Sequence, residues 1–461
     1  MAVDMATADQ ILKIDYRDGI HAEYARQCRV FNMFQREGEE QQTSSDVYRI
    51  ALDIAPSQGR RSYRRSPNQF ARTDGQPEVR KADVTYPIAF NPIRINPDVV
   101  FRAANGDAAM IDMLDHTIKQ LRKIECSSAE RAACTGYGHD LLFEIASVPG
   151  GAPWTYGVEN YAGVSGEPMG TILHLINLLN AWVNFADPTT SGTPAAYNTV
   201  RNGGAPRKIT SWTMPIAGQT VTLNAEMVGA TVGDVVYLSH DEAGGVQSTV
   251  DGEVGLAGCI DDFTLLNPFQ TIASTDDTAM YFKSELINAG GVELNEDLLQ
   301  RLDSRTSVLQ GGDEEEGMGE TVYVANKFTV DRFAQSLTTI ANPGTASNRR
   351  VAYPVTREGF KPHYGYARQF LTYNGVPFVD SQLFFLKRLM KVNLSKETGV
   401  VMVRNGAAEG DFLTPAGGGP IAIRIAGGPL SEYVYYAMRT LAAHGRAGSG
   451  MLYNLATPAA A

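Results

Sequence analysis

The chain has 461 residues, of which 43% are hydrophobic and 20% charged, and this composition is ordinary for a globular protein with a hydrophobic core. The length predicts two or three packing units. The formal net charge of −11 excludes a protein that binds nucleic acid through its overall charge, so any basic stretch is a local exception.

The first elements predicted along the chain are an arm and a long hairpin. Residues 1–45 are polar and of mixed charge, and we interpret them as an extended N-terminal arm. Residues 46–55 alternate weakly and predict a strand, and the period of two from Val84 to Phe90 predicts a second strand. Pro87 cannot donate to a ladder, so the second strand is expected at an edge. The residues between the two strands would form a long hairpin.

This hairpin carries a local excess of positive charge against Asp74 and Glu78. Tyr63 and Phe70 are its only interleaved aromatic residues, which is few for stacking single-stranded nucleic acid. An ordinary solvated loop and contact with nucleic acid stay open as readings. A hairpin with so few apolar residues cannot order itself, however, so we expect it to lie on a neighbouring copy of this acidic protein. The candidate inter-subunit contact residues are Arg60, Arg61, Arg64, Arg65, Arg72, Arg80 and Lys81.

Two helices are predicted next. Residues 106–133 place apolar side chains on one stripe at helical spacing, with Asp107 as a plausible N-cap. Residues 168–186 predict a second helix that ends before Asp187-Pro188. Residues 172–186 within it are the most apolar stretch, which is too short to cross a bilayer. No apolar signal segment is found at the N-terminus, so we expect a soluble, cytosolic product.

The period then changes to two, which predicts a small inserted β module over residues 207–266. Its four expected strands are separated by turns at roughly ten-residue spacing. They are KITSWTM, QTVTLNA, GDVVYLS and GLAGCIDDFTLL.

The final third is predicted to be mixed. Helices are expected at NEDLLQRLDSR, with Asn295 as the cap, and at TVDRFAQSLTTIA, with Thr329 as the cap. Tyr373-Asn374-Gly375 is a strong hairpin turn signal between two further strands. Other strands are expected at TVYVAN, GVVMVRNG, PIAIRIAGG and within residues 432–455.

No searchable catalytic motif is found. The chain lacks a phosphate-binding P-loop, a GxGxxG, an HExxH and a GxSxG, and its seven histidines never pair at a ligand spacing. The acidic run 313–316 is interpreted as a solvated loop, with a divalent ion as the alternative. Four cysteines without a CxxC pair indicate a reducing compartment, and Cys126 and Cys134 are too far apart along one helix for a disulfide. We therefore predict no catalytic residue, no cofactor and no metal.

The order of these parts resembles the major capsid protein of a tailed double-stranded DNA bacteriophage, with the Hong Kong 97 fold. MIDMLDHTIKQLRKIECSSAERAACTGYGHDLLFEIA resembles the spine helix of that family and the Gly-rich segment after it. VTLNAEMVGATVGDVVYLSHDEAGGV resembles the small β-barrel module that some members carry. VYVANKFTVDRFAQSL and LTYNGVPFVDSQLFF resemble parts of the axial domain.

The resemblance implies an α+β structural protein with five parts. They are the N-terminal arm (1–45), the E-loop hairpin with flanking strands (46–100), a peripheral domain with the spine helix (101–206), the inserted β module (207–266) and the axial domain with C-terminal strands (267–461). Hexamers and pentamers would close into an icosahedral shell around double-stranded DNA. The implied partners are a scaffolding protein, a portal and a decoration protein, with assembly in the host bacterial cytoplasm, residence in the virion and no membrane contact.

One departure from the family concerns covalent cross-linking. Some members join a lysine and an asparagine between the E-loop and its neighbour, but Lys81 is the only lysine between residues 46 and 106 and lies near the base of the hairpin. We therefore expect no such cross-link. Three other readings stay open: an encapsulin-like cellular compartment shell, a mixed α/β enzyme with a scattered site, and a nucleic-acid-binding protein that uses the basic arm.

Overall fold

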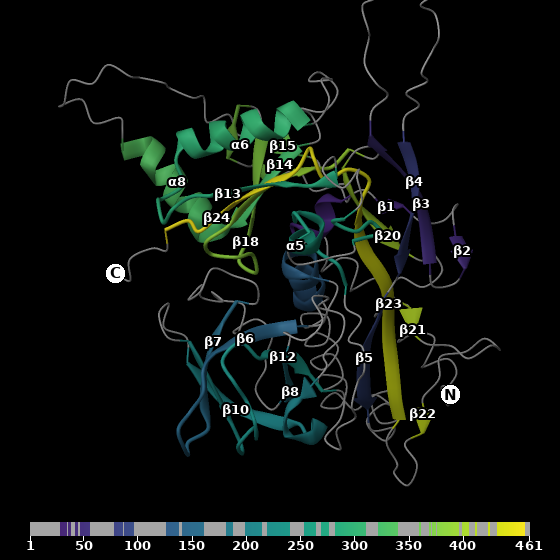
Figure 1. Ribbon diagram of the computed structural model, residues 1–461, viewed down its shortest axis with the longest axis vertical. Coiled ribbons are helices and arrows are strands. Elements are labelled where there is room, and N and C mark those ends of the chain that lie inside the picture. The colour runs from purple at the N-terminus through teal and green to yellow at the C-terminus, as the bar shows by residue number, and fades with distance from the viewer. Residues whose placement is uncertain are drawn as a thin grey trace, which may run out of the picture.

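The computed structural model has an α+β architecture in which sheets dominate and helices are few (Figure 1), as predicted. The structure describes residues 28–34, 36–37, 42–44, 47–55, 78–85, 87–95, 126–137, 141–160, 181–187, 199–213, 219–239, 253–263, 269–275, 282–309, 321–339, 359–360, 368–369, 371–374, 376–395, 399–404, 411–412, 423–424 and 431–456.

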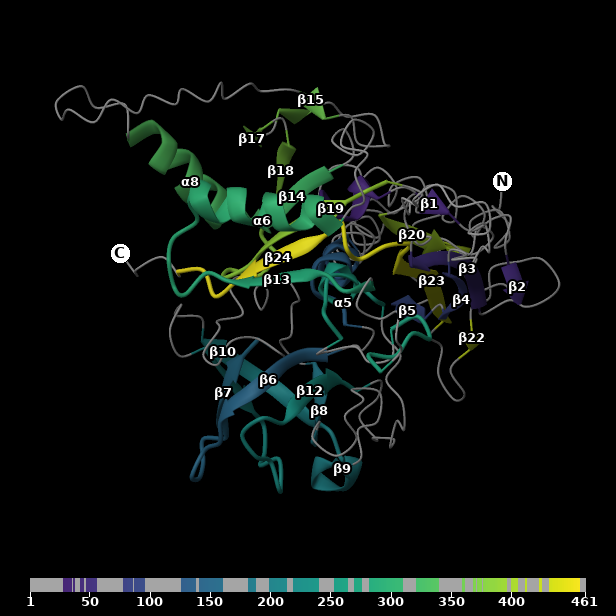
Figure 2. The same cartoon turned by 45° about the horizontal axis from the view of Figure 1, so that its top comes forward.

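A small barrel forms one end of the molecule (Figure 2). Its strands are β6 (Leu141–Ser147), β7 (Thr155–Glu159), β8 (Trp182–Asp187), β9 (Thr199–Val200), β10 (Arg207–Thr213), β11 (Thr220–Leu223) and β12 (Val235–Leu238). Strand β10 pairs with both β11 and β8, so six strands close on themselves, and β9 is added to β8. Closure pairs both sides of each strand in the ring and removes the sheet edges. A short 3-10 turn, η2 (Arg201–Gly204), follows β9.

Side chains fill the interior of this barrel. Tyr156 and Phe185 meet edge-on with ring centroids 5.1 Å apart, and the Tyr156 hydroxyl accepts the backbone N–H of Met227 at 3.0 Å. Phe143, Ile145 and other alternating apolar residues complete the core. The barrel is therefore a packed structural unit.

Two predictions fail in and beside this barrel. Residues 182–186, predicted as the end of a helix, form strand β8, because their side chains are buried on both faces of the strand between β12 and β10. Residues 256–259, predicted as part of a strand, form the short helix α5 (Leu256–Cys259). The barrel also takes its strands from 141–238, so it begins well before the predicted module at 207–266; three of the four predicted strands are β10, β11 and β12.

A second sheet carries the two longest helices described. Its order is β13-β24-β19-β14-β18-β17, with α6 (Glu296–Leu309) and α8 (Lys327–Thr339) packed against it (Figure 1). The strands are β13 (Glu285–Asn288), β14 (Thr321–Asn326), β17 (Thr372–Tyr373), β18 (Val376–Ser381), β19 (Leu389–Asn393) and β24 (Gly450–Tyr453). The predicted hairpin is confirmed, since β17 and β18 pair antiparallel and Asn374 takes a φ of 51°.

The caps of these two helices test the sequence prediction residue by residue. Asn295 caps α6 as predicted, because its Oδ1 accepts the N–H of Leu298 at 2.9 Å. The prediction of Thr329 as the second cap is wrong. Helix α8 begins earlier, where Asn326 Oδ1 accepts the N–H of Phe328 at 3.0 Å, and the Thr329 hydroxyl instead donates to the Leu386 carbonyl at 3.2 Å.

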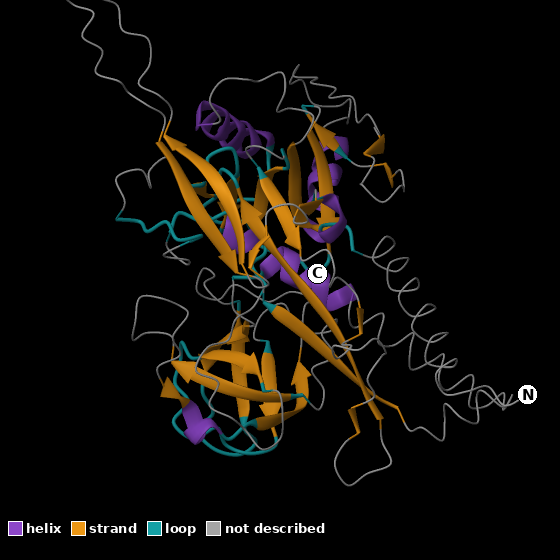
Figure 3. Ribbon diagram, turned by 90° about the vertical axis from the view of Figure 1, so that its right-hand side faces the viewer, coloured by secondary structure: helices purple, strands orange, loops and turns teal. Residues whose placement is uncertain are grey.

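A third sheet is built around the long strand β23 (Ser431–Ala443). Strands β1 (Arg36–Glu37), β20 (Val400–Arg404) and β21 (Asp411–Phe412) extend it in the order β1-β20-β23-β21, and β22 (Ile423–Arg424) and β5 (Ile88–Ile95) also pair with β23. The β5–β23 ribbon is continuous from Ile95↔Ser431 to Ile88↔Met438 and extends away from α6 and α8 (Figure 3). It joins segments more than 300 residues apart in the sequence. Strands β15 (Gly359–Phe360) and β16 (Arg368–Gln369) form a separate small pair.

The remaining sheet has the order β2-β3-β4, with β2 (Gln42–Ser44), β3 (Val47–Ala55) and β4 (Glu78–Thr85). The predicted second strand of the hairpin is divided between two sheets. Strand β4 ends at Thr85 and β5 starts at Ile88, so the change of sheet falls next to Pro87. Proline cannot donate to a ladder, which fits its place at this break.

The largest core lies among these sheets, where the helical segment 126–135 and α5 meet. Gly136 ends the helical segment and Gly255 lies against it, with the N–H of Gly255 donating to the Gly136 carbonyl at 2.9 Å. A Cβ on Gly255 would lie 2.0 Å from the Ala132 carbonyl oxygen, so only glycine allows this approach. Residues 106–125 of the predicted spine helix lie outside the described residues, 126–133 are helical as predicted, and the helix continues to Thr135.

Candidate assembly surface

The hairpin base is held to the body by one face of its strands. Strands β3 and β4 pair antiparallel from Val47↔Thr85 to Ala55↔Glu78. The inward side chains, Tyr48, Ile50, Ala82 and Val84, are buried in the largest core. Successive side chains of a strand point to opposite faces, so the outward set stays accessible while the base is fixed. The strand pair lies at the periphery of the molecule (Figure 1).

A bidentate ion pair marks the outward face. Arg49 Nε lies 2.6 Å from Asp83 Oδ1, and Arg49 Nη2 lies 3.0 Å from Asp83 Oδ2. Their hydrogen bond raises the pKa of Arg49 and lowers the pKa of Asp83. The two residues are directly opposite in the β3–β4 register, which fixes the two strands relative to each other. Sequence reasoning missed this pair, and only the strand register could have revealed it.

The structure places two of the seven predicted contact residues. Arg80 and Lys81 lie within β4, opposite Leu52 and Ala51, whereas the prediction placed them between the two strands. Lys81 is exposed. The β4 strand is longer toward its N-terminal end than predicted because β3 offers partners as far as Ala55. The other five lie outside the described residues: Arg60, Arg61, Arg64, Arg65 and Arg72.

Residues 28–34, predicted as part of an extended arm, are a compact buried turn that includes η1 (Phe31–Met33). Five of its residues lie in the largest core: Cys28, Val30, Phe31, Met33 and Phe34. The high apolar content of this stretch, five residues of seven, could have signalled burial. This part of the arm is therefore an anchor inside the subunit.

A buried carboxylate holds that anchor. Glu130, in the helical segment 126–135, accepts the backbone N–H of Val30 at 3.1 Å and of Phe31 at 2.9 Å. Burial raises the pKa of Glu130, and the hydrogen bonds from the anchor and from Ser381 oppose that rise. The carboxylate thus replaces the helical partners that these N–H groups lack at the start of a short turn.

Two arginines add charged contacts around the same turn. Arg29 forms an ion pair with Asp380 of β18. Arg439 of β23 lies with its guanidinium 4.8 Å from the ring centroid of Phe31 and pairs with Glu253 at 3.2 Å. The anchor therefore contacts elements of two sheets as well as the helical segment, which makes it a connection point of the fold.

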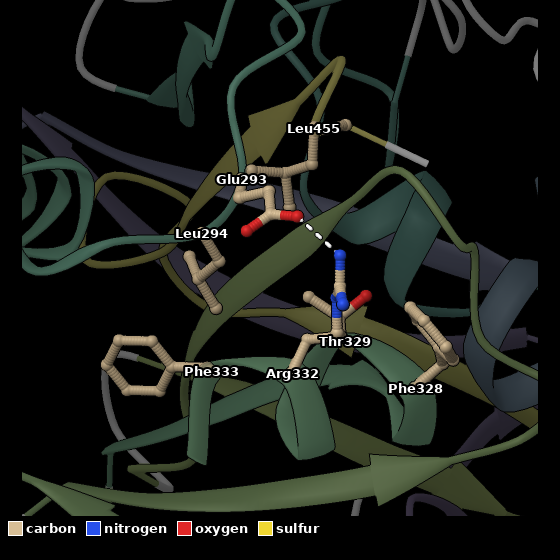
Figure 4. A pocket seen from close by; sticks show the side chains of 8 residues that line it. Glu293, Leu294, Phe328, Thr329, Arg332, Phe333 and Leu455 are labelled. Carbon is tan, nitrogen blue, oxygen red and sulfur yellow. Dashed lines mark hydrogen bonds and ion pairs between the residues drawn. The ribbon is translucent and has the colours of Figure 1, made fainter. Parts of the chain in front are cut away.

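The surface of α8 contains a small pocket with a free volume of about 20 Å³, roughly the space of one water molecule (Figure 4). Arg332 reaches across it to Glu293 at 2.7 Å, and Leu294 and Phe333 line it. Phe328 at its edge is 39% exposed. A space of this size cannot hold an organic substrate.

The described residues offer little for chemistry. All four cysteines are buried free thiols, and burial raises the pKa of Cys28, Cys134 and Cys259, the last to about 12. Such thiols are poor nucleophiles in the folded state. Within the described ranges, no group of three or more histidine, cysteine, aspartate or glutamate side chains is placed to hold a metal ion. No helix in the same part of the chain is long and apolar enough to span a membrane.

Comparison with known proteins gave matches among solved structures only, since no family model and no curated protein matches the sequence. The chain is similar to a structure described as the cyanophage A-1(L) capsid asymmetric unit, with 9% identity, 93% of each chain covered and a TM-score of 0.46. It is also similar to one described as Mycobacterium phage Patience, with 10% identity, 99% of this chain and 90% of that chain covered, and a TM-score of 0.41.

A third similar structure is the holo-SrpI encapsulin complex from Synechococcus elongatus PCC 7942, with 10% identity, 92% of this chain and 86% of that chain covered, and a TM-score of 0.39. The three matches cover nearly the whole of each chain, but their sequence identities are very low. With every TM-score below 0.5, the likeness is one of general chain arrangement.

Proposed function

We propose that this protein is a structural subunit that assembles with copies of itself into a closed shell, namely the major capsid protein of a tailed double-stranded DNA bacteriophage. The observation that carries the proposal is the strand pair β3–β4, which flanks the basic segment 56–77 and is fixed on the core. The inward side chains of β3 and β4 anchor the pair to the core, and the Arg49–Asp83 ion pair holds the two strands together.

Charge supports contact between copies. Residues 56–77 contain five arginines and one aspartate, a formal charge of +4, so the rest of the chain carries −15. We infer that this basic segment contacts the acidic surface of a neighbouring copy. Each exposed ion pair contributes little, about 0–1 kcal/mol, but a closed symmetric shell repeats it at every subunit boundary.

The parts of the subunit fit this role without catalysis. In the Hong Kong 97 scheme, the hairpin is the E-loop, the β5–β23 ribbon and the helical segment 126–135 belong to the peripheral domain, the sheet with α6 and α8 is the axial domain, and the barrel is the inserted module. Hexamers and pentamers would build the shell around DNA in the bacterial cytoplasm, with scaffolding, portal and decoration proteins as partners. The shell would rely on non-covalent contacts at the E-loop.

Charge reversal in the basic segment of the hairpin tests this proposal. Replacing Arg60, Arg61, Arg64 and Arg65 by glutamate should prevent closed shells, because the arm would then repel an acidic neighbour. The matched control replaces the same four residues by lysine, which keeps the charge and should preserve assembly.

Both variants would be compared with the wild type by negative-stain microscopy and by thermal unfolding of the unassembled subunit. Normal shells from the glutamate variant would refute the role of the basic hairpin segment in contacts between subunits. A wild-type protein that stays monomeric, with or without candidate scaffolding proteins, would refute the capsid proposal. Enzyme-loaded shells from an uninfected cell would point to a cellular compartment instead.

A further inference from the structure

We propose that Cys28 and Cys126 form a redox-sensitive pair whose oxidation to a disulfide fastens the N-terminal anchor, residues 28–34, to the helical segment 126–135. The sequence distance between the two cysteines gives no hint of this pairing. The tertiary fold brings them together in one core.

The contact between the two residues is direct. The Cys28 thiol donates to the Cys126 carbonyl oxygen at 3.2 Å. Their exposed fractions are 2% and 1%. Cys134 shares the neighbour Glu130 with Cys28 and also lies by Ser381, whereas Cys259 lies by Arg446.

The surroundings make the pair slow to react in the closed state. Burial and the nearby Glu130 raise the pKa of the Cys28 thiol, whereas Arg439 lowers it. The thiolate is the reacting form, so oxidation depends on brief opening of the anchor and becomes faster as pH rises. A reducing cytoplasm therefore leaves both thiols free during folding.

The oxidant is a low-molecular-weight disulfide such as glutathione disulfide. One cysteine thiolate attacks a sulfur of this molecule, breaks its S–S bond and expels one small thiolate, leaving a mixed disulfide on the protein. The second cysteine thiolate then attacks the protein-bound sulfur and expels the second small thiolate. The two cysteines are oxidised, the small disulfide is reduced to two thiols, and the two cysteine protons end on those thiols.

The bond would close a loop of about 100 residues and so restrict the unfolded chain strongly. Its biological meaning rests on the proposed function. A capsid subunit folds in a reducing cytoplasm and later persists outside the cell, where oxidation would lock the anchor in place after assembly. The pairing itself is a property of the subunit and can be tested whether or not shells form.

The test starts from the fully reduced full-length protein, exposed to glutathione disulfide at neutral and at mildly alkaline pH. Free thiols are then alkylated and the protein is digested without reduction. We expect a peptide pair that joins Cys28 to Cys126, lighter by about 2 Da than the two reduced peptides together, which forms faster at the higher pH. The oxidised protein should melt at a higher temperature than the reduced one, and dithiothreitol should reverse the shift.

Three single variants are the controls. Cys28→Ser and Cys126→Ser should lose the joined peptides and the melting shift, and Cys259→Ser should keep both. If both thiols stay alkylatable under oxidation that cross-links the same protein in denaturant, the proposal is wrong. A disulfide from Cys28 to Cys134 in the native protein would equally overturn it. Neither result would bear on shell assembly, which is read by microscopy on the reduced protein.

Discussion

Replacing Glu130 by alanine should loosen the N-terminal anchor from the helical segment 126–135. The change leaves the buried N–H groups of Val30 and Phe31 without their acceptor. An unsatisfied buried donor costs about 1–3 kcal/mol, so the two together cost about 2–6 kcal/mol. The buried carboxylate is itself unfavourable, so its removal offsets part of this cost. The free energy that holds the anchor closed should therefore fall by about 2–4 kcal/mol.

The readout should be local, because a chain with several sheets need not unfold in one step. Hydrogen exchange measured at Val30 and Phe31 reports the opening of the anchor directly. A loss of about 2–4 kcal/mol corresponds to exchange that is roughly 30- to 1,000-fold faster at these amides. The control is Glu293→Ala, which removes an exposed partner of Arg332. This change should leave hydrogen exchange at Val30 and Phe31 unchanged. Exchange at Val30 and Phe31 that changes less than about threefold in Glu130→Ala would refute the reasoning.

Three further predictions follow from the same structure. Because burial raises the pKa of Glu130 above its unfolded value, the stability gained from the protonated group is fully present below about pH 4.5 and is lost as pH rises through the folded pKa. The protection factors of Val30 and Phe31, which are corrected for the intrinsic pH dependence of amide exchange, should therefore fall across that window in the wild type and stay constant in Glu130→Gln. Gly255→Ala should abolish soluble folding, because its Cβ would overlap the Ala132 carbonyl, whereas Gly150→Ala, with nothing within 4 Å, should express and melt like the wild type. Asn326→Ala should lower the free energy of unfolding in urea by about 1–3 kcal/mol, because it removes the α8 cap and the donor to the Phe384 carbonyl, and an unchanged midpoint would contradict this.

Local sequence patterns were enough to predict much of the secondary structure in the region with α6 and α8. The helical spacing in residues 295–305 predicted α6, and the polar residue before it, Asn295, is the observed cap. The turn signal at Asn374-Gly375 predicted the β17–β18 hairpin. In these cases the decisive interactions lie within a few residues of each other, so the sequence contains the information in one short window.

The same reasoning failed where burial on both faces hid the period. Residues 182–186 are mainly apolar without a regular alternation, which fits a buried helix as well as a buried strand. The segment is a strand because it pairs with β12 and β10. The cap of α8 shows a similar limit, because the Thr329 hydroxyl is drawn to the Leu386 carbonyl from another part of the chain.

For the candidate assembly surface, the sequence by itself determined the basic composition of the arm, the strands that flank it and the acidic charge of the rest of the chain. Only the tertiary structure decided that the strands pair through Arg49 and Asp83, and that residues 28–34 are a buried anchor held by Glu130. The reason is physical. Charge and periodicity are properties of neighbouring residues. Register and the satisfaction of buried N–H groups depend on partners that folding brings together, 34 residues apart for Arg49 and Asp83 and 100 for Val30 and Glu130.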